Sequence, residues 1–366
     1  MIKSNDIISP YQIAMIVVMT IIGVGIFSLP AQLAKTAGTD SWFVIILGGV
    51  INIIGLNVIL LLNNRFPQKT LPEFAGQIIG SVPAKILTAI YAIYFTIFIA
   101  YEARVLNEVV KVFLLFRTPS EIIIISLILV CTYAVRGGVE CVARVMELFF
   151  PLLFIPLLLV LIPGIAEFEL NNMLPVFHNL PSKILISIPI MSLSFAGYEI
   201  LLFYVGFMDK PKKAYLSATA AMIFVTIIYA VITVLCFSVF GENFLQRMPW
   251  PLLGYVRSIN LPGLFIERLD GIMLGIWVLT VFTTMAALYF ALTYSLSKIF
   301  ATKEQKQFAL PMVPIIYYLA LLPDNVAQLD LLSTYMFQYL GRILIFVVPL
   351  ILLLIAWLRK KGGIKA

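Results

Sequence analysis

Two interruptions in otherwise apolar sequence constrain this chain more than any other feature. The first, GVGIFSLP at 23–30, lies in the middle of the first hydrophobic segment, and the second, SFAGYE at 194–199, lies in the middle of the sixth. Backbone groups left unpaired at membrane depth are costly unless they line a cavity or hold a ligand. Two broken helices in corresponding positions of two halves therefore predict a binding site. The alternative is that these glycines only allow close helix packing.

The composition places the hydrophobic segments in a membrane. The 366 residues are 62% hydrophobic and 12% charged, with a mean hydropathy of +1.05, whereas soluble proteins are nearer half apolar and a quarter charged. The three cysteines lie in or beside apolar segments, which argues against a disulfide framework. With one histidine, no metal-binding cluster and no phosphate-binding loop, the sequence predicts neither an enzyme nor a cofactor or metal site. Only Lys3 precedes the first span, so we expect no cleaved signal peptide.

The apolar segments repeat in length and character. The third and eighth are long, the fourth and ninth are short, and the first and sixth are broken. This pattern predicts one five-helix unit at 10–163 and a second at 183–358. Because five is odd, the second unit would be inserted upside down, giving an all-α membrane domain over 1–366 built as a five-plus-five inverted repeat. The ten spans are expected at 10–34, 41–62, 83–116, 120–135, 141–163, 183–206, 214–240, 269–300, 308–322 and 335–358.

Basic residues predict the orientation. With the N-terminus in the cytoplasm, 16 Lys and Arg fall in inside segments and 7 in outside segments, and such a bias favours two cytoplasmic termini. The net charge of +7 then reflects topology rather than a nucleic-acid surface. Residues 164–182, which include His178, are expected outside. Residues 241–268 are expected outside too, either as a lid or as an interfacial connector anchored by Trp250.

The two breaks predict a site for a zwitterion such as an amino acid. In this orientation the outer half of the first span begins near Gly25-Ile26, where N–H groups and the positive helix end suit a carboxylate. The outer half of the sixth span ends near Leu193–Phe195, where carbonyl groups suit an ammonium. The predicted substrate-binding residues are Gly23, Val24, Gly25, Ile26, Phe27, Phe195, Ala196, Gly197, Tyr198 and Thr284, with Tyr94 and Phe98 as one wall unless these two serve only in packing.

Three residues are candidates for binding a proton or another cation. Glu199 directly follows the second break, and an intramembrane carboxylate is expensive and usually functional. It could bind a proton, cap the inner half-helix, or do both. Thr283 and Thr284, in the eighth span, could coordinate a small cation together with carbonyls of the unwound first span. The alternative, favoured here, is that each hydroxyl bonds to its own helix.

Charged residues also occur along the third and fifth spans. Glu102, Arg104, Glu108 and Lys111 lie in the outer half of the third span, where they are expected to line a wet vestibule. Spacings of three and four residues predict ion pairs between Arg104 and Glu108 and between Glu108 and Lys111. A similar pair is expected between Arg144 and Glu147 at the start of the fifth span.

Beyond these patterns, the sequence resembles a known family. The breaks GVGIF and FAGYE resemble those of the amino acid–polyamine–organocation transporters. A longer, ordered set of motifs resembles one branch of that superfamily, the B subunits of spore nutrient germinant receptors. The resembling stretches are ISPYQIAMIVVMTIIGVGIFSLP at 8–30, AGTDSW at 37–42, RFPQKTLPEFAGQIIG at 65–80, LLFRTPSEIII at 114–124, RGGVECVARVMELFFP at 136–151 and ERLDGIMLGIWVLTVFTT at 267–284.

The resemblance implies a LeuT-like fold of ten helices in the inner membrane of a spore. It implies a site at Gly23–Phe27 and Phe195–Glu199 for an amino acid or another small nutrient. It also implies A and C partner subunits and germination as the output. Two other functions remain open: an ordinary amino acid permease coupled to protons or sodium, and a scaffold for partner subunits whose broken helices bind nothing.

Overall fold

Helices make up the computed structural model, which describes residues 6–23, 25–177, 181–192, 194–258 and 269–363. Six of them are long and apolar enough to cross a membrane, and the bent pair α1–α2 makes a seventh. The helices are α1 (Pro10–Ile21), α2 (Gly25–Ala34), α3 (Ser41–Arg65), α4 (Leu71–Ile79), α5 (Ser81–Phe113), α6 (Ser120–Arg136), α7 (Val139–Leu161), α8 (Pro181–Ser187), α9 (Leu201–Tyr204), α10 (Ala214–Leu245), α11 (Pro251–Ser258), α12 (Leu269–Ile299), α13 (Ala309–Leu321), α14 (Val326–Ser333) and α15 (Val348–Leu358).

The first predicted span is a helix pair broken where the glycines occur. Ser9 caps α1: its hydroxyl accepts the N–H of Gln12 at 3.2 Å, while the Gln12 side chain accepts the N–H of Ser9 at 2.9 Å. Pro10 follows at the first helical position, where the missing N–H costs nothing. The chain then turns by 54° between α1 and α2. The predicted helix start and the predicted break are both confirmed.

The sixth predicted span is also interrupted. It consists of α8, the 3₁₀ turn Ile188–Ser192, a second 3₁₀ turn at Tyr198–Ile200 and α9. Gly197, between the two turns, has a φ of +118°, a conformation that glycine adopts without steric cost. Two short helical pieces therefore meet at an irregular segment, as the sequence predicts.

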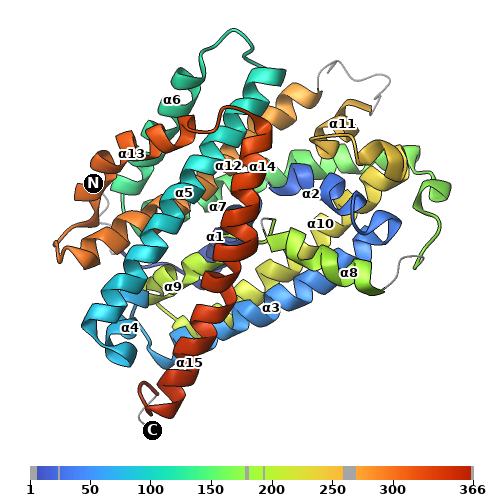
Figure 1. The fold of residues 1–366 in the computed structure, drawn as a ribbon. Helices are drawn as coiled ribbons and strands as arrows, with labels where there is room; N and C mark the ends of the chain where they lie inside the picture. The colour runs from blue at the N-terminus through green and yellow to red at the C-terminus, as the bar shows by residue number, and fades with distance from the viewer. Residues whose placement is uncertain (1–5, 24, 178–180, 193, 259–268, 364–366) are drawn as a thin grey trace.

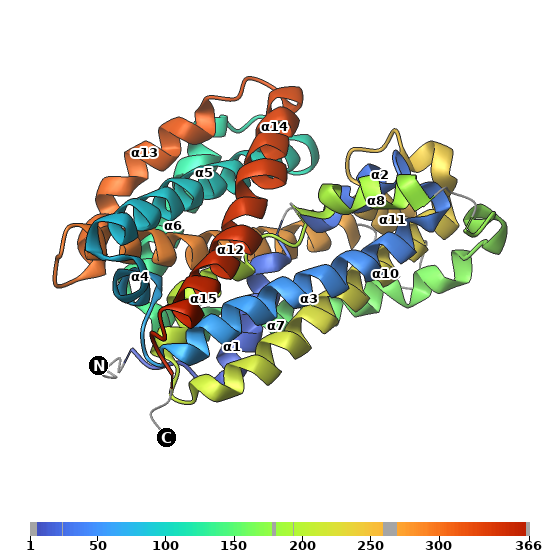
Figure 2. The ribbon, with the colours of Figure 1, turned by 60° about the horizontal axis from the view of Figure 1, so that its bottom comes forward.

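Helix α12 forms the centre of the bundle. It packs along α5, α7, α6 and α1, and 83% of its most apolar stretch is buried inside the protein. The pair α3 and α10 packs side by side on another part of the bundle (Figure 2). Large apolar side chains on the outer helices remain exposed, among them Tyr133 at 85% and Leu216 at 77%. Such a surface suits a lipid environment.

The loops predicted to lie inside gather at one end of the bundle. The Arg65 side chain donates to the Lys361 carbonyl at 2.7 Å, and Arg359 donates to the Ile78 carbonyl at 2.8 Å. Near the N-terminus, Ile8 pairs with Met208 in an isolated β-bridge. The loops predicted to lie outside meet at the other end, where Thr39 donates to the Pro175 carbonyl at 2.6 Å.

The remaining differences from the predicted spans have local causes. The last apolar element runs over Val326–Leu358, longer than 335–358, and contains π-helical turns at Thr334–Gly341 and Ile343–Val347. Within residues 241–268 the chain forms α11, which packs on α2, α10 and α12. Leu252 and Tyr255 of α11 are buried, and whether the segment is a lid or an interfacial connector stays a prediction. His178 lies outside the described residues.

The predicted orientation can be tested with single cysteines. In a Cys141→Ser background, we expect Lys303→Cys to react with an impermeant maleimide only in inside-out vesicles. Phe168→Cys should react only in right-side-out vesicles, because the basic bias places the two residues on opposite sides. Cys131 and Cys236 are buried and should contribute little labelling. The reverse pattern would contradict two cytoplasmic termini.

Candidate functional site

The two breaks pack directly against each other. A Cβ atom built on Gly25 would lie 2.8 Å from the Ser194 Cα, and one built on Gly197 would lie 2.9 Å from Thr20 Cγ2 and 3.1 Å from the Thr20 carbonyl oxygen. Glycine is therefore required on both sides of the contact. The two breaks, 170 residues apart, form one continuous region at the middle of the bundle.

Side chains from α10 and α12 satisfy the backbone carbonyls that the breaks leave without helical partners. The Tyr229 hydroxyl lies 3.0 Å from the Ile21 carbonyl and 2.9 Å from the Ser194 carbonyl, so it links the first break to the second. The indole N–H of Trp277 donates to the Gly23 carbonyl at 3.3 Å. The Ser194 carbonyl, which the sequence assigns to an ammonium, therefore already has a hydroxyl partner. Neither Tyr229 nor Trp277 is predicted from the sequence, although each is a polar group on an otherwise apolar helix.

Thr283 and Thr284 both reach the unwound end of α1. Thr284 Oγ1 lies 3.1 Å from the Met19 carbonyl and 3.2 Å from the Thr20 carbonyl, and Thr283 Oγ1 lies 3.3 Å from the Met19 carbonyl. Thr283 also donates to the Thr280 carbonyl of its own helix at 2.7 Å. The expectation that each hydroxyl bonds to its own helix therefore holds only in part for Thr283. The Thr284 hydroxyl bonds to carbonyls of α1. The pair brings two hydroxyl and two carbonyl oxygens together.

Glu199 is fully buried at the second break. Its carboxylate accepts the Gly197 N–H at 2.7 Å, which is the capping geometry that the sequence allows. Its other carboxylate oxygen and the hydroxyls of Tyr94 and Tyr198 are buried without a hydrogen-bond partner among the described residues. A buried carboxylate among hydroxyl groups can hold a proton or face a cation.

Glu102 is buried, so the prediction that it lines a wet vestibule is wrong for this residue. Its side chain is 2% exposed, and its two oxygens lie 3.1 and 3.2 Å from the position of a Cβ on Gly23. Thr284 Oγ1 lies 3.1 Å from the same point. Glu102 therefore belongs to the first break. The sequence analysis missed this because it grouped Glu102 with the neighbouring charges on α5, and one sequence does not show which face of the helix meets α1.

Among the described residues, one of the other expected ion pairs forms and two do not. Arg104 pairs with Glu108 at 3.0 Å, as predicted. Lys111, expected to pair with Glu108, donates to Ser120 Oγ at 3.2 Å. Arg144 pairs with Glu140 rather than with Glu147, because the carboxylate of Glu147 accepts the side-chain N–H of Gln12 from α1.

The predicted aromatic wall lies on α5 opposite the π-helical turns. The rings of Tyr94 and Phe98 are 5.9 Å apart, and the Phe98 ring lies 4.6 Å from that of Phe337. Phe337 also contacts the ring of Tyr101 at 5.4 Å. Turns of π-helix frequently occur at functional sites, so Phe337 is a residue that the sequence analysis missed. Since Phe95 of α5 packs against Phe203 of α9 at 5.3 Å while Glu102 lies beside Gly23, α5 runs past both broken spans.

The remaining predicted residues flank the contact between the breaks. Ile26 and Ala196 are buried. Phe27 packs edge-on against Trp277 at 4.6 Å, and Phe195 packs edge-on against Tyr229 at 5.3 Å. Val24 and Leu193, which the sequence also places at the breaks, lie outside the described residues.

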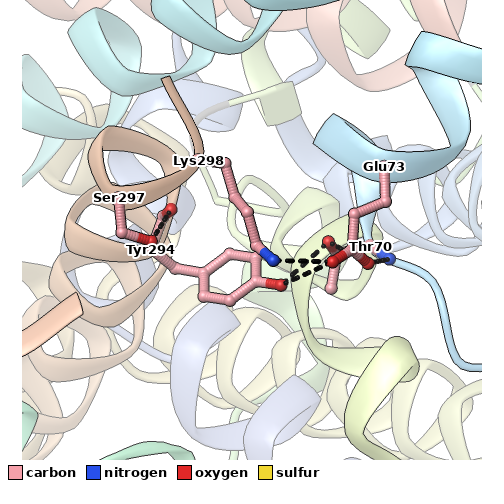
Figure 3. A network of polar contacts seen from close by, with 5 residues as sticks. All are labelled: Thr70, Glu73, Tyr294, Ser297 and Lys298. Carbon is pink, nitrogen blue, oxygen red and sulfur yellow. Dashed lines mark hydrogen bonds and ion pairs between the residues drawn. The ribbon is translucent and has the colours of Figure 1, made fainter. Parts of the chain in front are cut away.

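A polar network lies next to α12 at the end of the bundle that is predicted to be cytoplasmic. Lys298 Nζ lies 2.7 Å from the Glu73 carboxylate of α4, and Tyr294 joins them through the Thr70 hydroxyl at 3.2 Å (Figure 3). Burial raises the pKa of Glu73, but the bond and charge of Lys298 and the Thr70 N–H outweigh it, so that the pKa falls below its ordinary value. The network ties the loop after α3 to α12.

Comparisons with known proteins agree with this geometry. The family described as "Spore germination protein" matches residues 7–329. "Spore germination protein YndE" of Bacillus subtilis (strain 168) is 28% identical over 97% of this chain and 98% of the relative. "Spore germination protein A2" of the same organism is 29% identical over 97% of this chain and 96% of the relative.

Solved structures show the same fold. MhsT in complex with L-phenylalanine has a TM-score of 0.73 at 12% identity, covering 97% of this chain and 89% of that one. A sodium-coupled sialic acid symporter has a TM-score of 0.67 at 12% identity, covering 93% and 79%. The chain therefore has a LeuT-like transporter fold, and it is a multi-pass membrane protein.

The contact between the breaks predicts unequal costs of adding a methyl group. Gly25→Ala and Gly197→Ala should each destabilise the protein by about 1–3 kcal/mol, because the new Cβ meets backbone and Gly197 has a positive φ. Gly275→Ala on α12, where nothing lies within 4 Å, is the matched control. Thermal unfolding in detergent measures all three, and equal stability would contradict the packed contact.

The Glu73 network predicts a dependence on acid. A carboxylate whose pKa is lowered on folding stabilises the protein above its ordinary pKa of 4.5 and loses this effect as the pH falls through the lowered value. Glu73→Gln keeps an acceptor for the Thr70 N–H but removes the charge, so it should cost about 0.2–1 kcal/mol at neutral pH. Unfolding temperatures of variant and parent should converge below pH 4.5. Exposed Glu167→Gln should show no such convergence, and parallel curves for Glu73→Gln would refute the ion pair.

Proposed function

The chain belongs to the spore germination protein family, and on that premise we propose that it is the nutrient-binding membrane subunit of a germinant receptor. In this proposal it lies in the inner membrane of the spore with both termini in the cytoplasm. It binds a small nutrient of the amino acid type and, together with A and C subunits, triggers germination. Its fold supports this role, since MhsT of the same fold was solved with L-phenylalanine.

The single observation that carries the proposal is the contact between the two breaks. Helix α2 begins at Gly25, next to Ser194, and the first N–H groups of a helix would stabilise a ligand carboxylate there. Glu102, beside Gly23, supplies the negative charge for a ligand ammonium. We therefore assign the ammonium to Glu102 rather than to the span-six carbonyls alone. Phe27, Tyr94, Phe98 and Phe195 would surround the ligand side chain.

A sensor must convert binding into a change of conformation. A ligand shifts an equilibrium only by its difference in affinity for the two states, and a change from nearly off to nearly on takes about 5.5 kcal/mol. A ligand that contacts both breaks can supply this difference, because α1–α2 and α8–α9 would have to move together around it. The surfaces of these helices would pass the change to the partner subunits.

A cation-coupled amino acid permease is the second candidate. The observation that favours it is the arrangement of Thr283 and Thr284 against the Met19 and Thr20 carbonyls, since four such oxygens suit a small cation. Glu199 could serve a proton-coupled version instead. The two functions differ in whether the bound ligand leaves on the inner side.

Vesicles that contain only this chain separate the two functions. We expect saturable binding of a labelled amino acid, found by screening, with little uptake driven by a sodium or proton gradient. Gly25→Val should abolish binding, while Gly275→Val should preserve it. Strong, substrate-specific accumulation would replace the sensor by a permease, and absence of any binding would favour a scaffold.

The ion candidates can be separated by two substitutions. If Glu199 binds a proton during the response, Glu199→Gln should keep its shape and remove the pH dependence of ligand binding. If Thr283 and Thr284 hold a cation, their double Ala variant should lose any sodium or potassium dependence. An unchanged pH profile would leave Glu199 with its capping role alone, and a parent protein insensitive to both cations would end the threonine hypothesis.

A further inference from the structure

A polar pocket of about 340 Å³ opens at the inner end of the bundle, separate from the two breaks. It lies between the α6–α7 turn, the α12–α13 turn and the end of the segment after α9. Its volume falls within the range of about 300–1,000 Å³ that is usual for small-ligand sites. The residues that give it chemical character are Arg136, Lys298, Thr302, Lys303 and Lys306, with Asp6 and Glu304 as the carboxylates.

The charges of this pocket leave a surplus of cations. Lys298 is engaged by Glu73 at 2.7 Å and Lys306 by Glu304 at 2.9 Å. Within the part of the chain that the structure describes, Arg136 and Lys303 make no hydrogen bond or ion pair. They come from different turns of the chain, and beyond the two ion pairs the lining holds these two cations and one carboxylate, that of Asp6.

The lining also includes residues that carry backbone and hydroxyl donors. Gly137 and Gly138 line the pocket, and Gly138 precedes the 23-residue helix α7 without any side-chain cap. The first N–H groups of such a helix need acceptors and favour an anion. Thr302, also in the lining, has a buried hydroxyl with no hydrogen-bond partner among the described residues.

We propose that this pocket is a binding site for a phosphate-type oxyanion. Arg136 would bind it through its planar fork, Lys303 would supply a second charge, and the Thr302 hydroxyl and the start of α7 would donate the remaining hydrogen bonds. The volume leaves room for an organic group attached to the phosphate. The anion is therefore either a soluble phosphate ester or the headgroup of an anionic lipid.

Occupation of the pocket would join parts of the chain that the protein itself joins only weakly. Among the described residues, a side-chain hydrogen bond from Gln305 to the Val135 carbonyl at 3.1 Å links the α6–α7 and α12–α13 turns. The anion would add a bridge between Arg136 on one turn and Lys303 on the other. It would thereby stabilise the closed inner end, where the Ile8 N–H also donates to the Phe207 carbonyl at 2.9 Å.

Equilibrium dialysis of labelled orthophosphate against the full-length protein in phosphatidylcholine nanodiscs tests the site. We expect saturable binding that weakens at least about tenfold in the double variant Arg136→Gln/Lys303→Gln, since charge-assisted bonds to phosphate are lost. Because neither side chain has a partner, the variant should unfold at the same temperature as the parent without phosphate. Lys212→Gln removes an exposed charge that does not line the pocket, and it should bind phosphate as the parent does.

The possible outcomes separate a built site from general attraction. Absence of saturable binding, or equal weakening in Lys212→Gln and the double variant, would overturn the proposal. Nanodiscs that contain phosphatidylglycerol identify the source of the anion. If this lipid displaces labelled phosphate from the parent protein, the occupant is a headgroup; if phosphate still binds with unchanged affinity, the occupant is soluble. Both results support the pocket.

Discussion

The contact between the two broken helices is the constraint on which the rest of this structure depends. Each break exposes backbone groups at membrane depth, where water cannot satisfy them. Side-chain donors from neighbouring helices bond to the free carbonyl groups instead. Tyr229 on α10 bonds to carbonyls of both breaks, while Trp277 and Thr284 on α12 bond to carbonyls of the first. Helix α12 must therefore lie at the centre, and α10 must pack against α1. The arrangement of the long helices follows from this local need.

The same contact explains why glycine, not flexibility in general, occupies the breaks. Gly25 faces the Ser194 backbone and Gly197 faces Thr20, each closer than a Cβ allows. This close packing agrees with the plain interpretation of glycine as a packing residue, and it also brings a helix N-terminus, Glu102 and Glu199 into one buried region. Packing and binding are then compatible functions of the same residues, because a site for a small zwitterion needs backbone within reach of both charged groups.

Periodicity and composition in the sequence predicted the helical class, the bent first span, the interrupted sixth span and the grouping of loops at two ends. The ten-span count and the inverted repeat stay predictions. What the sequence could not predict depends on helix rotation. Glu102 is close to Arg104 and Glu108 along the chain, yet Glu102 lies beside Gly23 while Arg104 pairs with Glu108. Likewise, the Gln12 side chain of α1 donates a hydrogen bond to Glu147, which was expected to pair with Arg144. Contacts between distant segments decide such cases, and one sequence alone does not contain them.

Charged side chains gather at two levels of the bundle, at the breaks and at one end. At the breaks, Glu102 and Glu199 are buried among hydroxyl and backbone groups, where a charge costs free energy unless a ligand, proton or cation compensates it. At the end predicted to be cytoplasmic, Glu73 is compensated by Lys298, and Arg136 and Lys303 line an open pocket together with Asp6. Helix α12 connects the two depths, since Thr284 lies at the first break and Lys298 at the inner end. A ligand that moved α12 at one end would change the spacing of charges at the other.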